Sequence, residues 1–331
     1  MSEALVELKS IRKYFRLDSG HLDRARARYL HAVDDVSFTI QRGEIFGVIG
    51  ESGSGKSTIG RCILRLLDID AGEIWYDGVQ ISRFTSKEMK DYRRRMQMIF
   101  QNPIASFNPK KTIGASFREI GKVYKIPSDE MEKRIQDMVR YINLTGDVLS
   151  RLPRELSGGQ LQRLAIARAL LLEPEFLLAD EPVSALDVSV QAQVLNLLLD
   201  LKRNQGLTIL FISHDLTVVR QVCDTVAVVY LGVIVEMGPA DAVYTQVLHP
   251  YTQALIAAKP KEHPAEEKEH ILLEGEIPTA INVKEGCRFS GRCPRFREGL
   301  CSERTPKLRN MGAGHYVACH YPLQRTDVHN T

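Results

Sequence analysis

The sequence predicts an α/β fold with a mostly parallel sheet that is covered by helices. Three observations predict it: apolar strand-like runs alternate with helical patterns, a glycine-rich turn follows one such run, and two adjacent acids follow another. Alternating strands and helices imply crossover connections, which set strands parallel and place helices on both faces. Hydrophobic residues make up 44% of the 331 residues, so the chain can bury a sizeable core.

Strands are expected where apolar and β-branched residues alternate or run together between turn signals. We expect them at 4–8, 36–40, 45–49, 96–100, 176–179 and 208–212, and as a pair within 225–235. A hairpin is expected at 72–78, because its Asp-Gly step suits a tight turn. Helices are expected at 56–67, at 112–143 with a break near Pro127, from just after 157–159 to 172, and at 190–202.

A polar, basic insert at 16–31 separates the first two strands. Its arginines are interrupted by Asp18 and Asp23, so we expect a solvated loop. The alternative is a surface that touches a partner subunit or lipid headgroups. Composition shifts to charge and proline after Lys259-Pro260, which predicts a main domain at 1–258 and a C-terminal extension at 259–331.

Charge and leader signals narrow the function classes. The net charge of +3 gives no bulk attraction to nucleic acid. Met1-Ser2-Glu3-Ala4 leads straight into a strand-like segment, so we expect no signal peptide, and no apolar run reaches the roughly 18 residues of a spanning helix. In such a chain the six cysteines are not expected to form a disulfide framework, and Cys62 and Cys223 are predicted core residues.

A glycine loop at 50–57, Gly-Glu-Ser-Gly-Ser-Gly-Lys-Ser, predicts nucleotide phosphate binding. Glycines let backbone N–H groups approach phosphate oxygens, and the helix that follows directs its positive end at the same anion. Lys56 is expected to reach the β- and γ-phosphates, and Ser57 to ligate Mg²⁺. The residues assigned to nucleotide binding here are Gly50, Ser52, Gly53, Ser54, Gly55, Lys56, Ser57 and Thr58.

The apolar run 176–179 ends in two adjacent carboxylates, Asp180 and Glu181. A strand buried beside the glycine loop would leave Asp180 at its tip to hold the metal ion. Glu181 is then placed to orient and polarise the water that attacks the nucleotide. The alternative for Glu181 is an exposed acid at a strand end.

Leu156-Ser157-Gly158-Gly159-Gln160 lies about a hundred residues after the glycine loop. Together, the loop, the acidic strand end and this segment resemble the ATP-binding subunits of ABC transporters. The resemblance implies a P-loop ABC nucleotide-binding domain with an antiparallel β subdomain, a helical subdomain at about 104–172, and hydrolysis of ATP with Mg²⁺.

The resemblance also assigns single residues. Gln101 matches the glutamine that contacts metal and water, and His214 matches the histidine that contacts the γ-phosphate. Ser157, Gly159 and Gln160 match the signature loop, which binds the nucleotide of the opposite subunit, and Asp187 matches the loop that crosses the dimer seam. Tyr14 is expected to stack on adenine, with Phe15 and Tyr29 as competitors and simple packing as the alternative.

The segments 248–255, 286–289, 291–294 and 315–320 resemble the ATPases of oligopeptide and dipeptide permeases, in the second subunit type. This resemblance implies an ATPase that powers peptide import at the cytoplasmic face of the membrane. It also implies a paralogous ATPase partner, two transmembrane permease subunits and an extracytoplasmic substrate-binding protein. Nickel and oligosaccharide importers share the tail and stay open as alternatives. A soluble ABC-type ATPase usually has two ATPase halves or a long coiled coil, and this chain has neither.

Four cysteines are clustered near the C-terminus with the spacing C-x5-C-x7-C-x17-C: Cys287, Cys293, Cys301 and Cys319. Structural zinc sites usually contain a tighter pair, and the ferredoxin spacings differ too, so spacing shows only that four thiolates are available. The family resemblance favours a [4Fe–4S] cluster. Zinc and free thiols in a small core stay open as alternatives.

Overall fold

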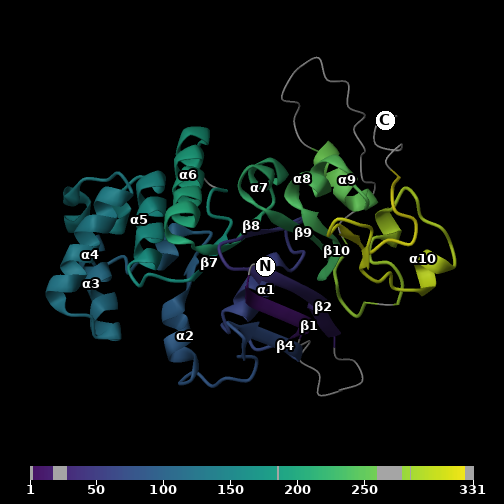
Figure 1. Cartoon of the computed structure of the whole chain (residues 1–331), viewed down its shortest axis with the longest axis horizontal. Coiled ribbons are helices and arrows are strands. Elements are labelled where there is room, and N and C mark those ends of the chain that lie inside the picture. The colour runs from purple at the N-terminus through teal and green to yellow at the C-terminus, as the bar shows by residue number, and fades with distance from the viewer. Residues whose placement is uncertain (1–2, 18–27, 185, 259–277, 284, 325–331) are drawn as a thin grey trace, which may run out of the picture. The chain divides into compact units, whose positions relative to one another are not determined.

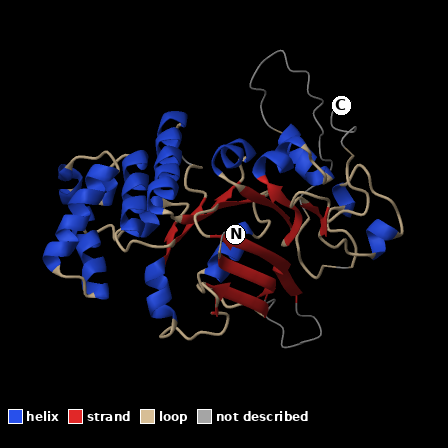
Figure 2. Ribbon diagram, viewed as in Figure 1, coloured by secondary structure: helices blue, strands red, loops and turns tan. Residues whose placement is uncertain are grey.

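The computed structural model describes residues 3–17, 28–184, 186–258, 278–283 and 285–324 (Figure 1). The chain divides into two compact units. The first unit comprises 1–41, 45–83 and 213–331, and the second comprises 42–44 and 84–212. Helices and strands alternate in both, as the α/β prediction requires (Figure 2). The fold class is therefore confirmed.

The first unit contains two groups of strands. An antiparallel sheet has the order β2-β1-β4-β5, and a second group has the order β11-β12-β10-β9-β3, in which β3 and β9 are parallel. The strands are β1 (Ala4–Leu17), β2 (Arg28–Gln41), β3 (Ile45–Ile49), β4 (Ala71–Tyr76), β5 (Val79–Gln80), β9 (Thr225–Tyr230), β10 (Val233–Pro239), β11 (Arg309–Asn310) and β12 (Tyr316–Val317). Its helices are α1 (Lys56–Ile63), α7 (Leu216–Val222), α8 (Ala240–Thr245), α9 (Pro250–Ala257), η5 (Ser290–Arg292) and α10 (Leu300–Glu303).

The second unit combines parallel strands with most of the longer helices. Its strands β6 (Met96–Ile99), β7 (Phe176–Asp180) and β8 (Thr208–Ser213) pair in that order, all parallel. Its helices are α2 (Met89–Arg95), η2 (Pro103–Ser106), α3 (Ile113–Tyr124), α4 (Ser128–Tyr141), η3 (Gly146–Ser150), η4 (Pro153–Glu155), α5 (Gly158–Leu170) and α6 (Val188–Gln205). Strand β7 is buried along its whole length, as its continuous apolar sequence predicts.

The expected strands, hairpin and helices are all present, with shifted ends. The first helix ends at Ile63 and not at Leu67, because Arg65 adopts a left-handed conformation (φ 53°) that a helix cannot continue. The hairpin turns at Asp77 and Gly78, both with positive φ. The long helical pattern is divided before Pro127, as expected.

The prediction of a solvated loop over 16–31 is wrong at both ends. Leu17 pairs with Arg28 and Arg16 with Tyr29, so the two strands continue well into the insert. Cross-strand backbone bonding outweighs the polar composition here. The remainder of the insert, 18–27, lies outside the described residues.

The described residues of the C-terminal segment pair and form hydrogen bonds with strands of the first unit. Val317 of β12 pairs with Glu236 of β10, and the Ala280 carbonyl accepts a hydrogen bond from the His31 N–H at 2.8 Å. Glu236 is fully buried, and its carboxylate accepts the N–H groups of Leu248 and His249 and lies 2.8 Å from His315 Nε2. These contacts hold the cysteine-bearing segment on the ATPase strands. The predicted boundary at 258/259 falls at the edge of the undescribed stretch 259–277 and stays a prediction.

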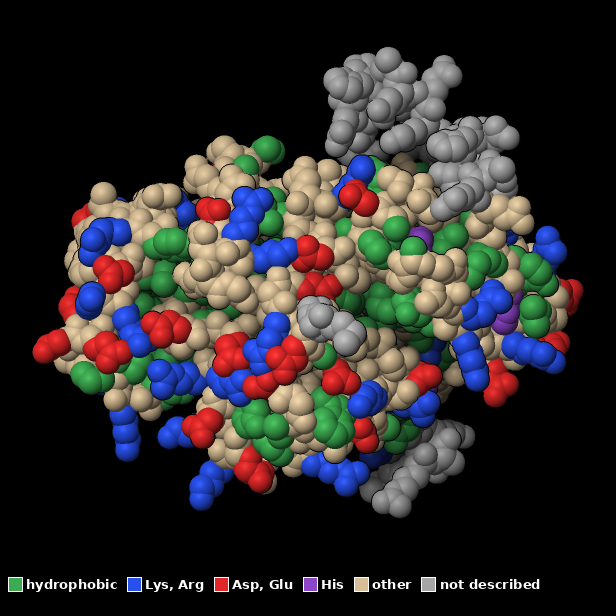
Figure 3. All heavy atoms as spheres, viewed as in Figure 1, with side chains coloured by type: hydrophobic (Ala, Val, Ile, Leu, Met, Phe, Trp, Pro, Cys, Tyr) green, Lys and Arg blue, Asp and Glu red, His purple; other side chains and the backbone are tan. Residues whose placement is uncertain are grey.

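Basic and acidic side chains are interspersed over the face drawn in Figure 3, as the small net charge leads one to expect. Within the described residues, none of the helices is both long and apolar enough to cross a bilayer.

Candidate nucleotide-binding site

The glycine loop connects the buried strand β3 to helix α1 in the first unit. Lys56, at the first position of α1, is 5% exposed, and its Nζ donates to the carbonyls of Gly50 at 2.8 Å and Glu51 at 2.9 Å. The ammonium group is thus held against the loop at the helix N-terminus, where the positive end of the helix dipole lies. This is the geometry that an anion such as a nucleotide phosphate requires.

Glycine is required at two places where the loop touches its surroundings. A Cβ on Gly50 would lie 2.1 Å from the Val229 carbonyl oxygen, and one on Gly55 would lie 2.1 Å from the Ala32 carbonyl oxygen. Both residues also have positive φ, 153° and 105°. The loop is therefore fixed by close backbone approach, which leaves its N–H side for a ligand.

A buried polar atom in this loop has no partner within the protein. Ser54 is 4% exposed, and its Oγ makes no hydrogen bond. Buried hydroxyl groups normally have a partner, so an unsatisfied one in a phosphate-type loop fits a ligand oxygen. The residues of the loop therefore fit MgATP, and a hydroxyl group such as that of Ser57 is a ligand type that Mg²⁺ accepts.

Tyr14 lies in β1 and is half-buried beside two residues of β2. Its hydroxyl donates to Asp34 Oδ1 at 2.5 Å, and its ring packs on His31 with centroids 4.1 Å apart. Burial, and then the hydrogen bond to Asp34, raises the pKa of Tyr14 to about 12. Both ring and hydroxyl are thus held in place, while Tyr29, one of its competitors, is 41% exposed.

The second unit places the two acids and the glutamine at the ends of parallel strands. Asp180 ends β7 and is 1% exposed. Glu181 follows with φ 49°, a left-handed conformation that is costly for a residue with a Cβ. Gln101, just past β6, donates from Nε2 to Glu181 Oε2 at 2.8 Å. The structure thus brings two of the three predicted catalytic residues into contact.

The signature segment forms the N-terminus of helix α5. Ser157 caps the helix by accepting the Gln160 N–H at 3.3 Å, and Gln160 Oε1 accepts the Ser157 N–H at 3.0 Å. This reciprocal cap fixes the N–H groups of the first turn at an anion-binding end. A Cβ on Gly159 would lie 2.6 Å from Val190 Cγ1, so glycine lets α5 and α6 approach closely.

The remaining two predicted residues lie at turn positions. Asp187 caps α6 and accepts the Val190 N–H at 3.0 Å and the Ser189 hydroxyl at 2.8 Å. These hydrogen bonds lower the pKa of its carboxyl, so Asp187 is an anion at neutral pH. His214 follows β8 and is exposed. The loop that the resemblance assigns to the dimer seam spans 184–187, and its residue 185 lies outside the described residues.

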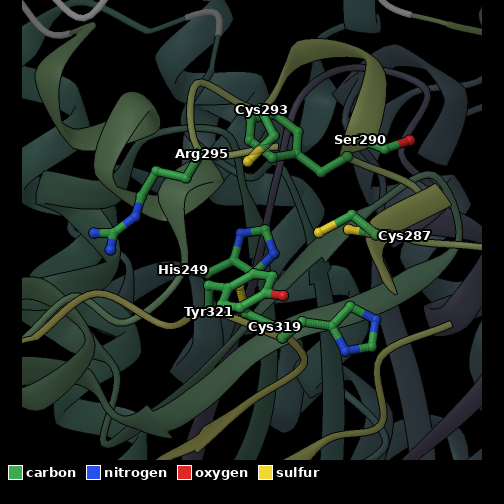
Figure 4. Close-up of a pocket in the computed structure, with 10 residues that line it drawn as sticks. His249, Cys287, Ser290, Cys293, Arg295, Cys319 and Tyr321 are labelled. Atoms are coloured by element: carbon green, nitrogen blue, oxygen red, sulfur yellow. The ribbon is translucent and has the colours of Figure 1, made fainter. Parts of the chain in front are cut away.

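The four C-terminal cysteines line one small pocket of the first unit together with His249. The sulfur atoms of Cys287 and Cys293 point toward the same space (Figure 4). Burial, and then the proximity of the other three thiols, raises the pKa of Cys287 to about 11. A thiol in this setting is protonated at neutral pH, so binding of any metal must release protons.

The size and spacing of this pocket limit what it accepts as it stands. Its volume is about 10 Å³, close to one water molecule. In the described part of the chain, no three His, Cys, Asp or Glu side chains are grouped closely enough to hold a metal ion. Four thiols are the donor set that iron–sulfur clusters use, but the pocket as it stands has room for about one water molecule.

The sequence did not indicate the residues that surround the loop. Glu51 forms a two-pronged ion pair with Arg292, and its N–H donates to the Tyr251 hydroxyl at 2.9 Å. The branch-specific motif at 248–255 includes Tyr251, but nothing in its pattern reveals a contact 200 residues away.

A phosphate loop, an acidic strand end and a capped signature helix in one chain define an ATPase of the ABC class. The family model described as "ABC transporter" matches residues 33–184, and the one described as "Oligopeptide/dipeptide transporter, C-terminal region" matches residues 235–301.

Similar proteins agree with this class. A probable peptide ABC transporter ATP-binding protein of Sinorhizobium fredii is 45% identical over 99% of this chain and 93% of its own length. The oligopeptide transport ATP-binding protein AppF of Bacillus subtilis is 42% identical over 96% of this chain and 97% of its own. The solved ATP-binding cassette MJ0796, a dimer with ADP and Pi, is 28% identical with a TM-score of 0.64, over 71% of this chain and 99% of its own. The chain therefore belongs to the ATP-binding proteins of ABC transporters, in the oligopeptide/dipeptide branch, and is an ATPase.

Proposed function

We propose that this chain is the ATP-hydrolysing subunit that powers the import of dipeptides or oligopeptides through a membrane permease. The observation that carries the proposal is the coexistence, in one chain, of a complete set of ATPase motifs and the C-terminal region of oligopeptide/dipeptide transporters. Relatives that are 42–45% identical over nearly the whole chain bear names of peptide transport.

The residue roles follow from the chemistry of each group. Lys56 and the loop N–H groups would neutralise the β- and γ-phosphates, and Ser57 would be a ligand of Mg²⁺ from the first unit. Asp180 and Gln101 would be its ligands from the second unit. Glu181 polarises the attacking water, and Gln101 positions Glu181 through the 2.8 Å hydrogen bond. His214 contacts the γ-phosphate, and Tyr14 stacks on adenine.

The signature helix serves the nucleotide of the opposite subunit. The Ser157–Gln160 cap fixes its N-terminus, which is an anion-binding end. We assign Gly159 and Asp187, the cap of α6, to the same interface between the two ATPase subunits. We expect Ser157→Arg to leave the Kd of the isolated chain for MgATP within about twofold, because in a shared site Ser157 contacts the nucleotide of the other subunit and not that of its own chain. ATP-dependent dimerisation should be lost. Calorimetry and light scattering measure the two quantities, and a tenfold loss of binding in the monomer would contradict a shared site.

Partners of this ATPase include permease subunits in the membrane, so its place is the cytoplasmic face as a peripheral subunit. We propose two transmembrane subunits, a paralogous ATPase and, indirectly, an extracytoplasmic substrate-binding protein, with no nucleic acid. A groove of about 680 Å³ in the second unit supports docking, since Phe107, Ile120 and Val123 line it beside Lys122. An amphipathic helix of a permease subunit has the chemistry that fits it.

The C-terminal extension, placed at 259–331, is proposed to hold a [4Fe–4S] cluster on Cys287, Cys293, Cys301 and Cys319. The convergence of all four on one pocket supports this proposal. Their side chains would supply the thiolates. The cluster would stabilise a segment with few apolar residues, since metal binding supplies folding free energy.

Metal content distinguishes the three hypotheses for the cysteines, namely an iron–sulfur cluster, a zinc site and free thiols. Protein purified without oxygen is expected to contain about four irons and four sulfides per chain, and Cys293→Ser to lose most of both. Cys62→Ser serves as the matched control, because Cys62 is a buried residue of α1 and does not line this pocket. One zinc without sulfide would favour a zinc site, and metal-free protein with normal thermal stability would leave only packing thiols.

The cargo class is tested on the assembled complex. ATP turnover by complexes in proteoliposomes is expected to rise when the binding protein is loaded with a dipeptide or an oligopeptide. Stimulation by nickel or an oligosaccharide instead would replace the peptide assignment by one of those importers. Full activity without any membrane subunit or cargo would favour a non-transport ABC ATPase.

A further inference from the structure

The cysteine-bearing segment contacts the phosphate loop through a partly buried ion pair. Arg292, the residue before Cys293, donates from Nη1 to Glu51 Oε2 at 2.8 Å and from Nη2 to Oε1 at 3.1 Å. The two side chains are 7% and 20% exposed. Glu51 is the second residue of the loop, and its carbonyl oxygen accepts from Lys56 Nζ. One residue thus contacts both the arginine of the tail and the lysine of the loop.

The backbone of Glu51 is held from the same side. Its N–H donates to the hydroxyl of Tyr251 at 2.9 Å, and Tyr251 is fully buried. The Tyr251 ring lies 5.5 Å from that of Phe289, which stands between Cys287 and Cys293 in the sequence and is 1% exposed. The cysteine segment therefore contacts the side chain of Glu51 directly, through Arg292, and reaches the partner of its backbone N–H through Phe289.

A second arginine of this segment reaches the predicted adenine side. Arg288, next to Cys287, donates to Asp34 and to the Leu231 carbonyl. Asp34 in turn accepts the Tyr14 hydroxyl. Each of these two arginines is adjacent in sequence to a cysteine of the pocket. Arg292 ends on the phosphate loop, and Arg288 ends on Asp34, the hydrogen-bond partner of Tyr14.

We propose that Arg292 is a positioning residue of the phosphate loop, which makes the affinity for MgATP depend on order in the four-cysteine segment. The proposal rests on the phosphate-binding role of the loop. A two-pronged arginine–carboxylate pair fixes geometry as well as charge. A loop that is already held in its binding conformation loses less conformational entropy when the nucleotide binds. Loss of order at the cysteines, by metal loss or oxidation, then weakens nucleotide binding without touching a nucleotide contact.

The test is a double-mutant cycle on the full chain, purified without oxygen, with MgATP binding measured by calorimetry. Arg292→Ala is expected to raise the Kd about tenfold, within the range of couplings through packed networks. Glu51→Gln should raise it by a similar factor, and the double variant should lose no more than either single variant. Arg304→Ala is the control, since Arg304 is an exposed arginine of the same segment, and its Kd should equal that of the wild type.

Further variants keep the test decisive. Arg292→Lys retains the positive charge but not the two-pronged guanidinium group, so a Kd between those of the wild type and Arg292→Ala is expected. Thermal unfolding without nucleotide shows whether each variant is folded. If Arg292→Ala does not fold, Glu51→Gln and Arg292→Lys carry the test. Folded variants that bind MgATP within twofold of wild type would overturn the proposal, as would additive losses in the double variant. If Lys56→Ala also binds normally, it is the phosphate-loop assignment that fails.

Discussion

Glu181→Gln is expected to lower ATP turnover by about 10² to 10⁴-fold, the usual contribution of a positioned general base. The amide keeps the size of the side chain but cannot take a proton from water. Nucleotide binding should persist, because Lys56, Ser57 and Asp180 are unchanged. ATP that is bound but not hydrolysed should then hold two subunits together as a stable dimer.

Steady-state phosphate release and light scattering with MgATP measure the two effects. Glu298→Gln makes the same chemical change at an exposed position and should behave like wild type. Gln101→Ala supplies an intermediate case, since it removes the hydrogen bond that orients Glu181 but leaves the carboxylate. Turnover of Glu181→Gln within a few-fold of wild type would mean that another group activates the water.

Lys56→Ala is expected to weaken MgATP binding by at least about 100-fold. The lysine is buried and tied to the carbonyls of Gly50 and Glu51, so its charge faces the loop. Two hydrogen bonds to charged phosphate oxygens contribute about 1.5–3 kcal/mol each, which corresponds to that loss or more. Calorimetry with MgATP measures it.

The exposed Lys87→Ala is the matched control, and its affinity should equal that of the wild type. A normal Kd for Lys56→Ala would remove the phosphate-cradle assignment. A variant that binds but does not turn over would mean that the lysine acts only in the transition state.

The parts of the site that consist of consecutive residues could be predicted from sequence motifs. The glycine loop is recognisable because close approach forbids a Cβ at Gly50 and Gly55, and Glu181 because it directly follows a buried strand. The positions of most strands and helices could also be predicted, from the periodicity of apolar residues. Their ends could not be predicted, because the left-handed conformation of Arg65 and the pairing of Leu17 with Arg28 depend on neighbours outside the local pattern.

Long-range contacts could not be predicted from the sequence. Arg292 and Glu51 are separated by 241 positions, and neither the glycine loop nor the motif at 291–294 indicates that the two side chains meet. The shift in composition after residue 259 likewise hides the pairing of β12 with β10. Pairing and burial of this kind arise only when the whole chain has folded.

Uptake of a labelled peptide into proteoliposomes tests the central claim most directly, namely that hydrolysis by this chain powers peptide import. The vesicles contain the complete complex, with ATP on the side of the ATPase subunits. Wild-type complex should accumulate peptide only with MgATP, and the complex with Glu181→Gln in this chain should bind ATP yet accumulate almost none. Equal peptide uptake by the two complexes, or uptake that does not require ATP, would contradict the account.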